Sequence, residues 1–262
     1  MKKFLVLFLT LALVLALAAC TPAETPAEST PAATEPAATE PAATEPAATE
    51  PAAEFDPSVK SEGVMTYAEY MAAEMDSEVT VEAFVQAHQS WWSNKITVYA
   101  QDLDGGYFFY EMACSEEDSA KLVPGTKIKV SGFKAAWDGE IEIIDATFEF
   151  AGEDTYVAAA TDVTALLGNN DELVKHQNKF VLFTDMTVVS IEYKNGEPGD
   201  DIYVTLSKNG AEYSFCVERY LTGPETAVYS AVGALAAGDV IDVTGFLYWW
   251  NGPNTHVTAV AK

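Results

Sequence analysis

The sequence predicts a mainly β protein that contains two copies of one small barrel. Three observations predict it: a repeated phrase, alternating apolar residues that are typical of strands, and Gly-containing turns between them. The phrase reads "GFKAAWDG" at 132–139 and "GFLYWWNG" at 245–252. Both copies begin with Gly-Phe and end with Trp, Asp or Asn, and Gly at identical spacing. The sequence therefore contains an internal repeat.

The repeat extends beyond the phrase. Seven positions between 125 and 139 recur at an offset of 113, and four positions between 96 and 109 recur at an offset of 106. The two offsets differ because the segment between them is longer in the second copy. That segment is expected to be helical in both copies, since Ser115 with Asp118 has capping-box spacing in the first.

Each copy predicts the same order of elements. A long alternating strand at 78–88 or 179–193 comes first, and a hairpin follows with its turn at Asp104-Gly105 or Asn209-Gly210. The helix comes next, and the repeated phrase then forms the turn of a second hairpin. Three strands, a helix and two strands is the order of the OB-fold, a five-stranded Greek-key barrel. A short helix is expected before each barrel, at 66–74 and within 161–177.

The first 57 residues lie outside this repeat. Lys2 and Lys3 precede sixteen uncharged residues, which is short for a spanning helix and typical of a secretory signal. The stretch from Leu17 to Cys20 resembles the lipobox of bacterial lipoproteins, and this implies cleavage before Cys20 and acylation of its sulfur. From 21 to 57, "PAATE" repeats predict an extended, disordered tether.

These observations divide the chain into four parts. We expect a lipoprotein signal peptide at 1–19, lipidated Cys20 and its tether at 20–57, one OB-fold domain at 58–152 and a second at 153–262. The expected location is the extracytoplasmic face of the cell membrane, with acylated Cys20 in the lipid bilayer.

Four segments of the repeat resemble the tandem OB-fold lipoproteins of Gram-positive bacteria. They are "TYAEYMAAE", "VTVEAFVQA", "PGTKIKVSGF" and "GDVIDVTGF". The resemblance covers about residues 62–262. It implies a fold and a location rather than a catalytic activity, and many such proteins are described only as nucleic-acid-binding-like domains.

Charge and motifs exclude several function classes. The chain has a net charge of −26, and about −20 remains after residue 57, where Arg219 is the only arginine. Such a surface repels phosphate, so nucleic acid is not the expected partner. No catalytic or metal-binding motif is present, so we expect neither catalysis, nor a cofactor, nor a metal. Cys114 and Cys216 are expected to be free, although a disulfide is allowed outside the cytoplasm.

Aromatic residues mark the candidate binding site. OB-folds bind ligands across strands 2 and 3, between the loops that join strands 1 to 2 and strands 4 to 5. All five tryptophans lie on these loops, and strand parity turns three further aromatic residues of the first barrel outward. The candidate ligand-binding residues are therefore Trp91, Trp92, Tyr99, Phe108, Tyr110, Trp137, Tyr248, Trp249 and Trp250.

Two interpretations of these aromatic residues remain open. The two barrels could cover each other's aromatic faces, or the residues could bind a ligand. For the ligand we expect a neutral glycan or a protein partner, because the electrostatics favour an uncharged molecule. The alternatives are single-strand nucleic-acid binding, as the fold suggests, and a role as a structural spacer or assembly subunit.

Overall fold

The computed structural model describes residues 55–262, which belong to one compact unit. The expected signal peptide, the lipidation site at Cys20 and nearly all of the expected tether lie outside the described residues. Among residues 55–262, every helix is too short or too polar to cross a bilayer.

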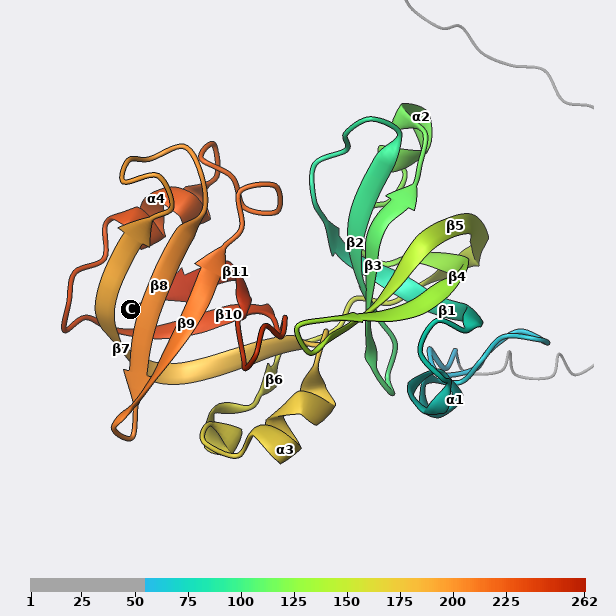
Figure 1. The fold of residues 1–262 in the computed structure, drawn as a ribbon. Helices are drawn as coiled ribbons and strands as arrows, with labels where there is room; N and C mark the ends of the chain where they lie inside the picture. The colour runs from blue at the N-terminus through green and yellow to red at the C-terminus, as the bar shows by residue number, and fades with distance from the viewer. Residues whose placement is uncertain (1–54) are drawn as a thin grey trace, which may run out of the picture. The chain divides into compact units, whose positions relative to one another are not determined.

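The first half of the described chain is a closed barrel, which we call barrel one (Figure 1). Its strands pair in the order β1-β2-β3-β5-β4, and β4 pairs back onto β1. The contact between β3 and β5 is parallel, and the other contacts are antiparallel. This is the OB-fold order that the sequence predicts. The strands are β1 (Glu78–His88), β2 (Lys95–Gln101), β3 (Gly106–Ala113), β4 (Thr126–Trp137) and β5 (Glu140–Thr155).

The second half repeats this topology as barrel two. The sheet order is β10-β11-β9-β8-β7-β6, and β10 also pairs with β7, which closes the barrel. The contact between β9 and β11 is parallel, as it is between β3 and β5. The protein is therefore mainly β, with two OB-folds in tandem. The strands are β6 (Thr161–Asp162), β7 (Phe180–Tyr193), β8 (Ile202–Lys208), β9 (Ala211–Val217), β10 (Val240–Phe246) and β11 (His256–Ala261).

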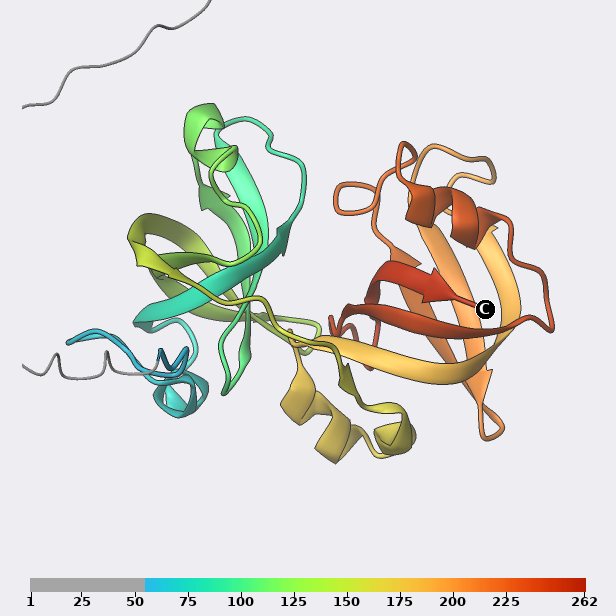
Figure 2. The same ribbon diagram turned by 180° about the vertical axis from the view of Figure 1, so that it is seen from behind.

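Short helices occur where the sequence predicts them (Figure 2). Before barrel one, α1 (Tyr67–Ala72) begins with a complete capping box between Thr66 and Glu69. Between strands three and four of the barrels stand α2 (Glu116–Ser119) and α4 (Ala227–Gly233). The segment before barrel two contains η1 (Thr164–Leu166), α3 (Asn170–Leu173) and η2 (Val174–His176).

The glycines of the repeated phrase have a steric role. A Cβ on Gly132 would lie 2.7 Å from the carbonyl oxygen of Ile144, and a Cβ on Gly245 would clash with the carbonyl oxygen of His256. Each glycine adjoins a register shift in the pairing with the last strand of its barrel. Such irregularities bend a strand and let it close a barrel. The repeat therefore preserves a bend.

The end of the phrase fixes a turn. Asp138 has a φ of 49° and Asn251 has a φ of 54°, which is the left-handed region that Asp and Asn tolerate best among non-glycine residues. In each copy a glycine with positive φ follows, as hairpin turns of this kind require.

Candidate functional site

The two turns of the repeated phrase contact each other. The backbone N–H of Asn251 donates to the carbonyl oxygen of Asp138 at 2.8 Å, and the Trp250 indole donates to the Asp138 carboxylate at 2.9 Å. The backbone N–H of Trp249 donates to Glu140 at 2.8 Å. The turns formed by the two copies of the phrase are therefore part of the contact between the barrels.

A buried aromatic cluster continues this contact, and we call the whole contact the joint. Tyr99 of barrel one stacks on Phe246 of barrel two with ring centroids 4.6 Å apart. The Tyr99 hydroxyl also forms a hydrogen bond of 2.5 Å with Nδ1 of His256. Phe108 makes an edge contact with Tyr248 at 5.4 Å.

The joint corrects part of the predicted site. Tyr99 and Phe108 were expected to form the floor of an open cleft, but they are 0% and 3% exposed. Strand parity does turn them out of barrel one. The outer face is covered by barrel two, because burying these rings removes a large apolar area from water. They are packing residues.

Burial governs the ionisable groups of the joint. Desolvation raises the pKa of Glu140 well above its usual value, although the Trp249 N–H and the Asn178 side chain partly oppose this. Glu140 Oε1 and Asn178 Oδ1 are buried without a hydrogen-bond partner among the described residues. A buried carboxylate oxygen without a donor favours a proton on Glu140, because burial disfavours the charged form. Burial also lowers the pKa of His256 to about 4, so the imidazole is neutral.

An open groove lies beside the joint. Its volume is about 540 Å³, and we call it the aromatic groove. Trp92 from the loop after β1, Tyr110 from β3 and Tyr220 from the segment after β9 line it, and all three rings are exposed. Both barrels therefore contribute to it. The N–H of Ser90 donates to the carbonyl oxygen of Tyr220 at 2.7 Å, which holds the two sides together.

Three charged side chains also line the groove. Lys95 Nζ and Glu111 Oε2 form an ion pair at 2.7 Å. Glu218 Oε2 accepts the backbone N–H groups of Tyr220 at 3.0 Å and Leu221 at 2.8 Å. Burial raises the pKa of Glu218 to about 7, and the nearby Asp201 adds to the shift.

The other predicted residues lie elsewhere. Trp91 is half-buried, and its indole donates to the carbonyl oxygen of Cys114 at 2.9 Å. Trp249 is buried in the joint, and Tyr248 stacks on His256 with centroids 4.4 Å apart. Trp137, which precedes Asp138, and Trp250, which donates to it, are exposed but do not line the groove. Of the nine predicted residues, only Trp92 and Tyr110 line it.

Sequence reasoning missed Tyr220 and Glu218. Both follow β9 in a segment that has no counterpart in the repeated phrase. The one signal in the sequence was that Tyr220 directly follows Arg219. In the structure the Arg219 guanidinium lies 5.0 Å from the Tyr220 ring centroid. Which loop of barrel two reaches barrel one depends on how the barrels dock, and this the strand pattern does not encode.

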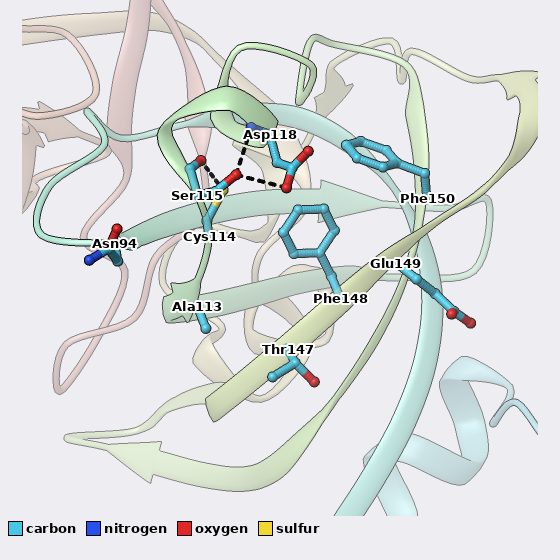
Figure 3. Close-up of a pocket in the computed structure, with 9 residues that line it drawn as sticks. All are labelled: Asn94, Ala113, Cys114, Ser115, Asp118, Thr147, Phe148, Glu149 and Phe150. Atoms are coloured by element: carbon cyan, nitrogen blue, oxygen red, sulfur yellow. Dashed lines mark hydrogen bonds between the residues drawn. The ribbon is translucent and has the colours of Figure 1, made fainter.

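A second, shallower pocket of about 590 Å³ lies between α2 and β5 of barrel one (Figure 3). Phe148 points from β5 toward α2, and Ser115 and Asp118 form the helix cap above it. Burial raises the pKa of the Cys114 thiol to about 11, so the thiol is protonated at neutral pH and is a poor nucleophile. Within residues 55–262, Cys114 and Cys216 are free and buried.

Metal ligands do not gather in this part of the chain. Among residues 55–262, no three His, Cys, Asp or Glu side chains lie close enough together to hold a metal ion.

Comparisons with known proteins give structural likenesses only. No family model and no curated protein matches the chain. The chain is similar to a murine DNA-binding protein bound to double-stranded DNA, at 12% identity and a TM-score of 0.35, covering 70% of this chain and 97% of that one. It is also similar to the Ifi202 HINa domain bound to double-stranded DNA, at 10% identity and a TM-score of 0.35, covering 71% and 96%. A replication protein A heterotrimer bound to single-stranded DNA is similar at 12% sequence identity and a TM-score of 0.28, and the match covers 69% of this chain and 50% of that one.

These likenesses correct the expectation about partners. Nucleic acid was set aside on net charge, yet the similar structures include proteins bound to double-stranded and single-stranded DNA. A charge summed over the whole surface does not give the field at one site. At the groove lie two cationic side chains, Lys95 and Arg219, each paired with a carboxylate.

Proposed function

We propose that residues 58–262 form a non-catalytic binding module and that the aromatic groove is its site. One observation carries the proposal: three exposed rings from two barrels line a single groove over β2 and β3. This is the face on which OB-folds bind their ligands. Exposed aromatic side chains gathered at one place mark interaction sites in soluble proteins.

The first candidate ligand is an oligosaccharide. Sugar rings present apolar faces to aromatic side chains and hydroxyl groups to polar ones. The groove offers both, because Gln89 and Thr97 line it together with Trp92, Tyr110 and Tyr220. Its volume of about 540 Å³ falls in the range of ligand sites in proteins.

The second candidate is a single-stranded nucleic acid. Bases stack on aromatic side chains in OB-folds, and each stacked base contributes about 1–3 kcal/mol. Two cationic side chains favour this candidate. Lys95 lines the groove, and Arg219 lies over Tyr220 at the margin of the groove. Each is paired with a carboxylate, Lys95 with Glu111 and Arg219 with Asp200, so a phosphate group would have to compete with these ion pairs.

A titration with two probes tests the proposal. We would follow the binding of an N-acetylglucosamine hexasaccharide and of a twelve-residue oligothymidylate by calorimetry. Trp92→Ala and Tyr220→Ala should each weaken binding of the true ligand by about tenfold or more. Trp137→Ala is the matched control, because Trp137 is an exposed tryptophan outside the groove.

The control decides the outcome. Unchanged affinity in Trp92→Ala and Tyr220→Ala would place binding outside the groove, and equal losses in all three variants would show that the losses are not specific to it. No binding of either probe would refute both ligand assignments. Loss confined to the groove variants, with one probe only, supports the proposal and selects the ligand class.

We also propose that the module is anchored to the extracytoplasmic face of the cell membrane through acylated Cys20. The support comes from the sequence, where an apolar segment ends at Leu17 to Cys20. Replacing Cys20 with Ala should abolish incorporation of labelled fatty acid and release the protein from membranes or leave its precursor uncleaved. Unchanged labelling and membrane retention would contradict the anchor.

A further inference from the structure

We propose that Glu218 determines the specificity of the aromatic groove and selects an oligosaccharide that carries a positively charged amino group. This inference rests on the proposed function and narrows it. An amino sugar combines the ring face that the aromatic side chains fit with a cation that the carboxylate fits.

The first argument is the local charge of the groove. Of the three charged side chains that line it, Lys95 and Glu111 neutralise each other at 2.7 Å. Glu218 forms no ion pair with any residue in 55–262. The ionised groove therefore carries one uncompensated negative charge at a known position.

The second argument is the geometry of the Glu218 carboxylate. Its Oε2 accepts two backbone N–H groups, from Tyr220 and Leu221, which hold the side chain in place. Its Oε1 accepts no hydrogen bond from the described residues. One oxygen thus positions the group, and the other is available to a ligand beside the Tyr220 ring.

The third argument concerns the neighbouring charges. Arg219 points away to Asp200, with 3.8 Å between the charged atoms, and Lys194 pairs with Asp201 at 2.9 Å. Both cations that could neutralise Glu218 are therefore committed to other carboxylates. A ligand ammonium group would meet Glu218 with no protein cation paired to it, in a half-buried place where opposite charges interact more strongly than in bulk water.

Protonation of Glu218 makes the selection depend on pH. Burial raises the pKa of Glu218 to about 7, with Asp201 raising it further and Lys194 opposing. Only the ionised carboxylate attracts a cation. Affinity for a permanently charged ligand should therefore rise with pH through about 7, whereas affinity for a neutral ligand lacks this step.

The test compares two trisaccharides that differ in one group. One is N-acetylglucosamine trisaccharide, and the other carries a trimethylammonium group on one terminal unit in place of the acetamide. With the full-length protein, the ratio of the two dissociation constants should favour the charged probe by about tenfold at pH 8 and fall toward one at pH 5.5. In Glu218→Gln the ratio should be near one at both pH values.

A matched variant separates local from general charge. Glu212→Gln removes the same charge from an exposed position of β9 outside the groove, so the ratio should stay as in the unaltered protein. An equal loss of preference in both variants would overturn the inference, as would a preference that persists in Glu218→Gln. Binding of both probes without preference would overturn it and leave the proposed glycan function standing. Tight binding of oligothymidylate that Glu218→Gln strengthens would overturn it in favour of the nucleic-acid candidate.

Discussion

The joint and the aromatic groove use the same face of one strand for opposite purposes. Phe108 and Tyr110 are two residues apart on β3, so both point out of barrel one. Phe108 is 3% exposed and packs in the joint, whereas Tyr110 is 45% exposed and lines the groove. The period of a strand determines the side to which a residue points. The neighbour that covers that side determines whether the residue packs or binds.

The polar groups of the two regions differ in the same way. In the joint, His256 is neutral and hydrogen-bonded to Tyr99, and burial favours the protonated form of Glu140. In the groove, Lys95 and Glu111 form an exposed ion pair. The buried part of the joint disfavours charge because it excludes water, whereas the groove holds an ion pair where water reaches it.

The largest effect should come from truncating the two rings on β3. Phe108→Ala should lower the free energy of unfolding by about 3–5 kcal/mol, because it leaves a cavity in a closely packed cluster. Tyr110→Ala should cost less than about 1 kcal/mol, because its ring is half in water. Urea unfolding measures both. Similar losses for the two variants would remove the distinction between joint and groove.

Acidification should weaken the joint through His256. Its pKa is lowered from 6.5 to about 4 in the folded protein, so the unfolded chain binds the proton more tightly. Stability from this group is complete above pH 6.5 and is lost as the pH falls toward 4, by about 3 kcal/mol. His256→Gln, which stays neutral, should lack this component.

The His256 measurement is a difference between two proteins. Glu140 and Glu218 have raised pKa values and gain protons over part of the same range, which stabilises the fold on acidification. Subtracting the unfolding free energies of His256→Gln from those of the unaltered protein at each pH cancels these carboxyl groups. A difference that does not change between pH 7 and pH 4 would show that His256 is not held neutral.

Much of the fold follows from local chemistry in the sequence. Gly132 and Gly245 mark close approaches of backbone, and Asp138 and Asn251 mark turns with positive φ. These requirements are local, so they survive in both copies and can be recognised by aligning the chain with itself.

The site follows from the sequence only in part. Trp92 could be identified because it lies on a loop that borders the binding face of the fold. Tyr220 could not, because its place depends on the docking of two barrels, and docking depends on the shapes of surfaces that are distant in the chain. For the same reason Tyr99 and Phe108 were predicted to bind a ligand: the strand pattern shows that they point out of barrel one, but it does not show that barrel two covers them.

The smallest effect should come from Glu140, and it tests whether the joint excludes charge. The pKa of Glu140 is raised above its unfolded value, so the folded state binds its proton more tightly. Stability from this group is complete below about pH 4.5 and is lost as the pH rises.

Glu140→Gln keeps an acceptor for the Trp249 N–H and supplies a permanent donor where Glu140 needs a proton. It should therefore stabilise the protein by about 1 kcal/mol at pH 8 and have little effect at pH 4. Glu111→Gln, at an exposed carboxylate of the groove, is the control and should show no such rise. Thermal unfolding from pH 4 to pH 8 measures both variants. A loss of stability at every pH in Glu140→Gln would mean that the joint requires the carboxylate, and the contrast with the groove would then lie in packing alone.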